Sequence, residues 1–300
     1  MDKNPQRQRT AAAALEPRVS AVVVARGIRP RAAASSALDL CLRSALAEPW
    51  IDDVVIVDHG NVAEVSSALR VLQLDRRDVR VINAPKSMSE AGAANLGAAA
   101  ARGRWLLFLD AGIVLQRGAV ARMAAAGGGA QSPWIVGGRL LDSRGRDRPA
   151  ARAGALNSWS AIAVAMDWRG PRPLRRRGVR VEPDEALPVA AVSGAFMLIG
   201  RHDFQELAGF DDKFGAEGAD LDLCRRAHDA GGAVLFQPAA AGVQFLRAPA
   251  GLSRAQSLAR FASKSAKTPL QKVFALIAGP ALAVLVALKD FVAGRPPHQR

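Results

Sequence analysis

A regular alternation of short apolar runs and longer amphipathic segments between residues 19 and 110 constrains this chain more than any other feature. The apolar runs are rich in β-branched residues and end in loops or acids, as buried strands do. Between the first two runs, apolar residues recur at intervals of three and four, which predicts an amphipathic helix. This alternation implies an α/β fold with a mostly parallel central sheet flanked by helices. The expected strands are 19–24, 52–58, 79–82 and 105–109, and the expected helices lie in 33–46, 62–72 and 83–101.

The fourth expected strand, Trp105–Leu109, consists of five apolar residues and is followed at once by Asp110. Ligands of open α/β sheets bind at the carboxyl ends of the strands, so Asp110 is the best single candidate for a ligand-contacting residue. No GxGxxG motif follows the first strand, and the chain has no P-loop motif. A nucleotide bound at this edge is therefore not held by a glycine-rich phosphate loop.

The second half of the chain continues the pattern less regularly. Ser193 and Gly194 are small residues inside an expected strand, and a glycine there often marks the close approach of a ligand or another backbone. Asp220 stands where a helix begins, and an acid in that place can be merely an N-cap. The expected elements are a helix over 114–126, a strand and turn over 134–141, a polar hairpin tip over 142–148, a strand over 189–199, a helix from Asp220 to Gly231 and a strand over 233–236.

The formal net charge of +14 favours anionic partners, namely phosphorylated substrates, nucleic acid or anionic lipid, without choosing among them. Six arginines lie in residues 169–180, in a segment that is either a solvated loop or a grip for a diphosphate or a membrane surface. Cys41 and Cys224 have no metal-ligand spacing and are interpreted as buried thiols. Residues 1–17 lack the apolar core of a secretory signal, so we expect a disordered tail.

The C-terminal part carries a different pattern. Lys264 and two further lysines precede the sixteen-residue apolar run Val273–Leu288, which Gly279 and Pro280 interrupt. A helix that crosses a membrane needs about 20 apolar residues. The run therefore fits an interfacial or partly inserted helix better than a full span, and a helix packed on the protein's own surface remains the alternative.

Eight segments, taken together and in order, resemble one family. They are 19–24, 54–61, Asn83 with 92–97, 103–110, 136–142, 193–197, 209–211 and 220–225. This series resembles the glycosyltransferase family 2 enzymes with the GT-A fold, in particular the bacterial rhamnosyltransferase-like branch. The resemblance implies a GT-A nucleotide-diphospho-sugar transferase domain over residues 18–248, after the tail 1–17 and before a C-terminal apolar helical segment, residues 249–300, that is associated with a membrane.

The resemblance also implies an activity, the inverting transfer of a sugar from a nucleotide-diphosphate donor to an acceptor. Asp220 matches the general base. Asp110 matches the first acid of the Asp-x-Asp element, which carries the divalent metal and the diphosphate. The other donor-side matches are Ala25, Arg26, Asp58 at the nucleobase and Asn95, and the acceptor-side matches are Ser193, Gly194 and Asp222.

These residue types suit that chemistry. A hydroxyl is a poor nucleophile, so a carboxylate must take its proton during attack. The leaving diphosphate develops negative charge that a cation stabilises, and oxygen ligands suit Mg²⁺ or Mn²⁺. Gly112 stands where the family usually has its second acid, and Gln244 stands near the usual histidine ligand. An active transferase and a non-catalytic relative that binds or scaffolds both remain open.

The implied partners are a nucleotide-diphospho-sugar donor, a lipid-linked or glycan acceptor, and the inner membrane surface. The implied place is the cytoplasmic face of the plasma membrane, where the protein would be peripheral or monotopic, and the implied process is cell-surface polysaccharide synthesis. We do not expect nucleic-acid binding, because no basic motif interleaved with aromatic residues appears.

Overall fold

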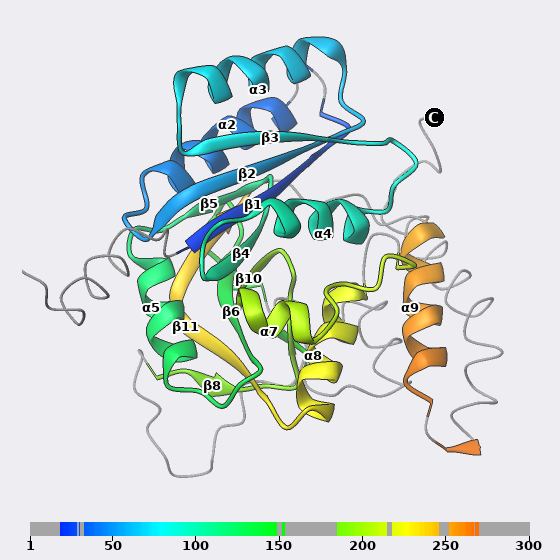
Figure 1. The fold of residues 1–300 in the computed structure, drawn as a ribbon. Coiled ribbons are helices and arrows are strands. Elements are labelled where there is room, and N and C mark those ends of the chain that lie inside the picture. Colours follow the sequence, from blue (N-terminus) through cyan, green and yellow to red (C-terminus); the bar gives the residue numbers. More distant parts are fainter. Residues whose placement is uncertain are drawn as a thin grey trace, which may run out of the picture.

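The computed structural model describes residues 19–28, 30, 33–148, 152–153, 185–214, 218–245, 252–266 and 268–269. Its centre is a nine-stranded sheet in the order β3-β2-β1-β4-β10-β6-β11-β5, with β8 paired to β11, and helices flank the sheet (Figure 1). The predicted α/β class with a central sheet between helices is confirmed.

The first half of the chain forms the parallel part of the sheet. Strands β2 and β4 both pair with β1 in parallel, and β3 pairs with β2 in parallel. The predicted helix over 33–46 is confirmed with the same bounds. The elements are β1 (Val19–Arg26), α2 (Ala33–Leu46), β2 (Ile51–His59), α3 (Ala63–Asp75), β3 (Val79–Ala84), α4 (Glu90–Ala100) and β4 (Trp105–Asp110).

The second half adds antiparallel pairing. Strand β10 lies antiparallel to both β4 and β6, and β11 is parallel to β6 but antiparallel to β5. The mostly parallel arrangement thus holds for the first half only. The elements are β5 (Ile113–Leu115), α5 (Ala119–Gly128), β6 (Trp134–Leu141), β7 (Arg152–Ala153), β8 (Leu187–Pro188), β9 (Ala191–Val192), β10 (Phe196–Gly200), α7 (Arg201–Glu206), α8 (Ala219–Asp229), β11 (Ala233–Gln244) and α9 (Leu252–Lys264).

Several expected elements differ in their bounds from those of the structure, and the strand expected over 233–236, for example, continues to Gln244 as β11. The expected helix over 114–126 begins only at Ala119, because Gly118 takes a left-handed conformation (φ 76°) and residues 113–115 pair with β11 instead. The expected single strand over 189–199 is interrupted at Ser193–Ala195. Its first part, β9, pairs with β7 in a separate two-stranded sheet, and its second part is β10.

The core has two layers, one on each face of the sheet. Successive residues of a strand point to opposite faces, so Leu106 and Phe108 of β4 pack with α4, α7 and α8, whereas Leu107 and Leu109 pack with α2, α3 and α5. Phe261 of α9 belongs to the first layer. Cys41 and Cys224 are free and buried, as predicted.

Helix α9 lies beside α8 at the edge of the domain (Figure 1). Within the part of the chain that the structure describes, no helix is long and apolar enough to cross a membrane. The apolar run 273–288 and the arginine-rich segment 169–180 lie outside the described residues, so the expectations for both stay predictions.

Candidate active site

The parallel strands bring four of the predicted donor-side residues to one edge of the sheet. Ala25 of β1 lies opposite Asp58 of β2, and Val24, its neighbour in the chain, lies opposite Asp110 of β4. Arg26 follows Ala25 and forms an exposed ion pair with Glu90 (3.4 Å). The carboxyl ends of three adjacent strands thus gather these residues, as the alternation of strands and helices predicts.

Asp58 is almost fully buried and is held by a residue that sequence reasoning missed. The Asn61 side-chain amide donates to Asp58 Oδ1 and to the Ala25 carbonyl oxygen, each at 2.7 Å. Asn61 Oδ1 in turn accepts from the Ile28 backbone N–H (2.6 Å). Asn61 therefore joins the turns after β1 and β2. The only signal in the sequence was its place in the Asp-His-Gly-Asn turn that closes the second strand.

Asp110 lies at the end of β4 and is paired with the last residue of β11. Gln244 Nε2 donates to Asp110 Oδ2 at 3.2 Å, across 134 residues of chain. Burial raises the pKa of the Asp110 carboxyl, and hydrogen bonds from Gln244 and from the backbone at Gly112 and Ala111 partly oppose that rise. Gln244 thus lies beside the acid that is predicted to carry the metal.

The residues around Asp110 can hold a divalent cation only together with a ligand. Asp110 supplies one carboxylate, and the Gln244 side chain supplies a carbonyl oxygen if its amide turns over. Gly112 adds no side chain, and its carbonyl oxygen already accepts from the Phe245 backbone N–H (2.9 Å). Mg²⁺ is commonly bound by one or two carboxylates together with substrate phosphates. The donor set therefore fits a cation shared with a diphosphate.

A second group of possible metal ligands, His202, Asp203 and Glu206 of α7, lies elsewhere. Helix α7 follows Gly200, which pairs with Trp105 at the start of β4, the end opposite Asp110. Asp203 already accepts hydrogen bonds from Ser132 Oγ (2.6 Å) and the Trp134 backbone N–H (3.1 Å). This group is therefore separate from the site at Asp110.

The interruption between β9 and β10 connects Asp110 with Asp220. The Asp110 backbone N–H donates to the Ala195 carbonyl oxygen (2.9 Å), and the Gly194 N–H donates to Asp220 Oδ2 (2.9 Å). Ser193 Oγ accepts from the Ala195 N–H (3.2 Å) and so shapes the same tripeptide. The two acids predicted as donor ligand and general base thus lie on the two sides of Ser193–Ala195.

Asp220 stands in the first turn of α8 and is not its N-cap residue. The N-cap residue is Gly218 in a left-handed conformation (φ 95°), which has no side chain to cap the helix. Asp220 Oδ1 accepts from the Leu221 N–H (2.9 Å), and the side chain is only partly buried. A carboxylate has about four lone-pair positions, so both oxygens retain capacity for an incoming hydroxyl.

Asn95 is engaged with backbone rather than open to a ligand. Its amide nitrogen donates to the Phe210 carbonyl oxygen (2.8 Å), and its amide oxygen accepts from the Phe210 N–H (2.9 Å). In this structure Asn95 joins α4 to the Gly209–Phe210 turn. Its predicted contact with the donor stays a prediction.

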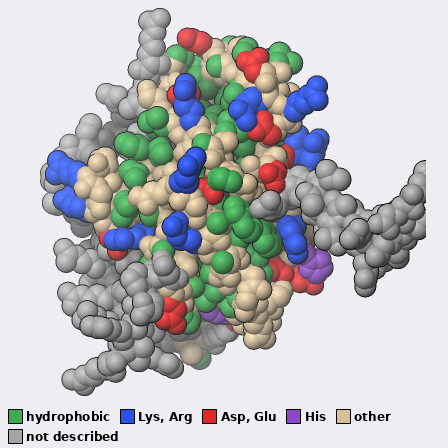
Figure 2. Space-filling view, turned by 90° about the vertical axis from the view of Figure 1, so that its left-hand side faces the viewer, with side chains coloured by type: hydrophobic (Ala, Val, Ile, Leu, Met, Phe, Trp, Pro, Cys, Tyr) green, Lys and Arg blue, Asp and Glu red, His purple; other side chains and the backbone are tan. Residues whose placement is uncertain are grey.

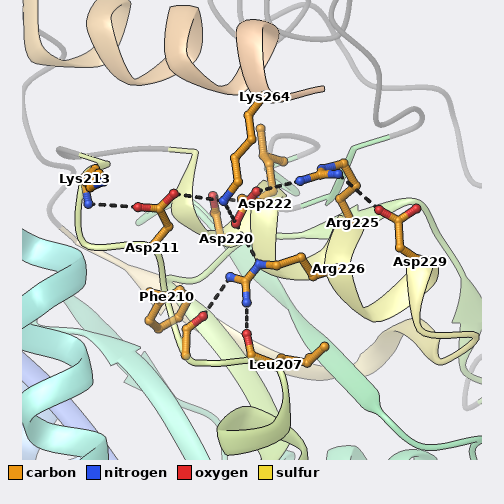
Figure 3. A network of polar contacts seen from close by, with 12 residues as sticks. Leu207, Phe210, Asp211, Lys213, Asp220, Asp222, Arg225, Arg226, Asp229 and Lys264 are labelled. Atoms are coloured by element: carbon orange, nitrogen blue, oxygen red, sulfur yellow. Dashed lines mark hydrogen bonds and ion pairs between the residues drawn. The ribbon is translucent and has the colours of Figure 1, made fainter. Parts of the chain in front are cut away.

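Asp222 was expected on the acceptor side, but its side chain is fully buried. It accepts hydrogen bonds from Arg226 (2.8 Å), Lys264 (2.9 Å) and Arg225 (3.0 Å), as Figure 3 shows. Burial alone would raise the pKa of Asp222, but these cations outweigh it and lower that pKa. With its oxygens enclosed in this way, Asp222 does not meet an acceptor in this conformation.

Basic side chains do not gather into one patch on the face that Figure 2 shows. There Lys and Arg lie scattered among apolar and neutral groups, with acids between them. The described surface of this face therefore singles out no broad anion-binding area, and the candidate site rests on the sheet edge and α8.

The chain is similar to proteins of a known family. A family model described as "Glycosyltransferase like family 2" matches residues 17–267. The chain therefore belongs to this family. The predicted family is confirmed, whereas the rhamnosyltransferase-like branch stays a prediction.

A curated relative is the "Pre-mycofactocin glycosyltransferase" of Mycobacterium tuberculosis, 28% identical over 189 residues. The match covers 62% of this chain and 36% of the relative, so the chain spans about a third of the relative's length.

Three solved structures show the same fold. GalNAc-T7 with UDP, GalNAc and Mn²⁺ has a TM-score of 0.63 at 16% identity. The match covers 94% of this chain and 58% of the GalNAc-T7 chain. S. aureus TarS 1–349 has a TM-score of 0.55 at 10% identity, with coverage of 92% and 72%. The mannosyltransferase PcManGT from Pyrobaculum calidifontis, with GDP-Man and Mn²⁺, has a TM-score of 0.53 at 16% identity. That match covers 93% of this chain and 75% of the PcManGT chain. The predicted GT-A fold is confirmed.

Proposed function

We propose that this chain is an inverting glycosyltransferase that moves a sugar from a nucleotide-diphosphate donor to a lipid-linked glycan acceptor in cell-surface polysaccharide synthesis. The observation that carries the proposal is the tripeptide Ser193–Ala195, which accepts from the Asp110 backbone N–H on one side and donates to the Asp220 carboxylate on the other. One short segment thus places the residue predicted to bind the donor next to the predicted base, as a single displacement needs.

The donor lies along the carboxyl edge of the sheet in this proposal. Asp58, oriented by Asn61, accepts hydrogen bonds from the nucleobase, and Ala25 and Arg26 line the nucleoside. The diphosphate lies near Asp110. Asp110, together with the diphosphate, would hold a divalent cation, which would stabilise the negative charge of the leaving group. Two of the similar solved structures, GalNAc-T7 and PcManGT, hold UDP or GDP-Man together with Mn²⁺, which supports this donor class and this kind of cation.

Asp220 acts on the acceptor. Its carboxylate takes the proton of the acceptor hydroxyl while the hydroxyl oxygen attacks the anomeric carbon. The bond from that carbon to the diphosphate oxygen breaks, and the nucleoside diphosphate leaves with the bonding electrons. Because attack and departure occur on opposite faces of the carbon, the anomeric configuration inverts. The Gly194 N–H holds Asp220 Oδ2 and so orients the base.

A panel of nucleotide sugars tests this function, with Asp220→Asn as the decisive variant. We expect turnover to fall by at least about a hundredfold, because the amide cannot accept a proton, while nucleoside diphosphate affinity stays unchanged. Asp212→Asn serves as the control, since Asp212 is an exposed acid of the neighbouring segment. Wild-type turnover in Asp220→Asn would show that the base has been assigned wrongly.

A non-catalytic binding protein is the second candidate, and the environment of Asp110 favours it. Gln244 donates to Asp110 where a metal ligand is expected, and Gly112 offers no carboxylate. Calorimetry with Mn²⁺ and nucleoside diphosphates separates the candidates. Tight, metal-dependent nucleotide binding supports the transferase, and the absence of any nucleotide binding supports the second candidate.

A further inference from the structure

A cluster of charged side chains joins three segments next to Asp220 (Figure 3). Lys264 Nζ, at the end of α9, donates to Asp211 Oδ2 and to Asp222 Oδ2, each at 2.9 Å. Asp211 also accepts from Arg260 of α9 (3.1 Å). Lys264 therefore bridges the Gly209–Phe214 segment and the first turn of α8 through one ammonium group.

The cluster is sheltered enough for its ion pairs to matter. The Asp222 side chain is fully buried, Asp211 is 17% exposed and Lys264 is 34% exposed. Charges interact more strongly when water is partly excluded. Burial opposes ionisation of Asp211, yet the hydrogen bonds from Lys264, Lys213 and Arg260 lower its pKa to about 2. Both carboxylates consequently remain charged at neutral pH.

Helix α9 is firmly attached to the domain, so it can act as a fixed support. Phe261 and Ala262 are fully buried in the core layer that also contains residues of α8. The Arg260 guanidinium and the Lys264 ammonium lie over the Phe214 ring, at 5.4 and 5.8 Å from its centre.

The ammonium group at the end of α9 contacts the first turn of α8. The N-cap residue of that helix, Gly218, has no side chain with which to anchor the turn. Asp222 faces the cations, while Asp220, two residues earlier, faces Gly194. Arg226 extends the anchoring, since it donates to Asp222 (2.8 Å) and to the carbonyl oxygens of Gly209 (2.7 Å) and Leu207.

We infer that Lys264 is a positioning residue for Asp220: by tying Asp222 to Asp211, it fixes the turn of α8 that presents the base. The inference rests on the proposed function only in taking Asp220 as the base. Lys264, which the sequence pattern placed on the flank of the apolar run 273–288, thus supports the candidate site itself.

The backbone amide of Gly194 reports on the position of Asp220 without any need for activity. It donates to Asp220 Oδ2 and belongs to a different segment from every residue that Lys264 contacts. In the full chain, Lys264→Met should make hydrogen exchange at Gly194 roughly tenfold faster, because the bond to Asp220 opens more often. Lys264→Arg should keep exchange near the wild-type rate.

Lys213→Met is the matched control. It removes one positive charge from the same neighbourhood, yet Lys213 contacts Asp211 through its backbone N–H, and within the described part of the chain its side chain makes no ion pair. Exchange at Gly194 should not change in this variant. Should Lys264→Met fail to fold, Asp211→Asn breaks the same bridge and should accelerate Gly194 exchange in the same direction.

Turnover supplies the second measurement. Lys264→Met should lower kcat by about tenfold to a hundredfold through misplacement of the base, with the affinity for nucleoside diphosphate unchanged, and Lys264→Arg should recover most of the loss. The inference is overturned if hydrogen exchange at Gly194 is unchanged in both Lys264→Met and Asp211→Asn. It is also overturned if Lys264→Met loses kcat and nucleotide affinity in parallel. A wild-type protein that turns over no nucleotide sugar refutes the proposed function instead, and Gly194 exchange still decides the inference.

Discussion

At Gly194 the absence of a side chain determines how closely two segments approach each other. A methyl group there would lie 3.2 Å from Asp220 Cβ and 3.7 Å from Asp220 Oδ2. Such a contact is tighter than most Cβ contacts, so either the tripeptide or the first turn of α8 must give by a few tenths of an ångström. The glycine therefore belongs to the machinery that orients the proposed base.

Gly194→Ala is expected to lower kcat by about tenfold to a hundredfold, because a small displacement of a reacting group is costly. The cost in stability should be about 1–3 kcal/mol, as for other overpacked sites. Gly128→Ala is the control, since the same methyl group meets nothing within 4 Å there. Steady-state kinetics and thermal unfolding of both variants provide the measurement, and an unaffected kcat in Gly194→Ala would contradict this role.

At the scale of elements, α8 and α9 are joined by ion pairs whose effect depends on pH. The folded-state pKa of Asp211 is about 2, below its ordinary value of 3.8. A carboxyl with a lowered pKa contributes stability that is present above the unfolded value and is lost as pH falls through the folded value. The bridge between these elements should thus weaken between about pH 4 and pH 2.

Asp211→Asn tests this pH dependence. At pH 7 it should cost about 1–2 kcal/mol, a modest figure because water partly screens Lys264 and Arg260. Between pH 4 and pH 2 the variant should lose less stability than the wild type, since it has no carboxylate to protonate at this position. Denaturant unfolding across this range measures both effects, with Asp212→Asn as the exposed control. Parallel pH profiles for wild type and Asp211→Asn would exclude the ionic bridge.

The elements that the sequence predicts best are those with local causes. The helix over 33–46 follows from its apolar periodicity, and the parallel strands follow from their β-branched runs. The helix over 114–126 was misjudged because apolar residues 113–115 suit either structure, and pairing with the distant β11 decided between them. Asp211 and Lys264 lie 53 residues apart and share no periodic pattern, so their ion pair was not predictable from spacing.

The residues of the candidate site likewise differ in how far the sequence could predict their places. Asp110 and Asp58 were predictable because strand ends in a parallel sheet gather at one edge. Asp222 was misjudged, because its position beside Asp220 in the chain does not reveal that a helix turns it towards α9. Asn61 was missed, because its role arises only when the turns after β1 and β2 meet.

For the whole molecule, the remaining question is how the GT-A domain reaches its acceptor. The family match extends to residue 267 and so includes α9, whose Phe261 packs in the core. The apolar run 273–288 follows it in the sequence. We expect this run to hold the protein at a membrane surface while α9 stays part of the domain.

Removal of residues 270–300 tests that expectation. The full-length protein should sediment with membranes, whereas the shortened protein should remain in the supernatant, because the apolar run supplies the buried area that binding needs. Nucleotide affinity should be equal in both, since Lys264 is retained. Recovery of the full-length protein without detergent in the supernatant would contradict membrane attachment.

The contact between Gln244 and Asp110 has a consequence for the order in which the protein is made. Domains generally fold as units during synthesis, and the strands that carry Asp58 and Asp110 leave the ribosome before the later strands of their sheet. The partner of Asp110, Gln244, emerges 134 residues after it, and Lys264 follows later still. A stalled or prematurely ended nascent chain that already contains Asp58 and Asp110 but not yet Gln244 therefore lacks the residues that complete both the sheet and the site.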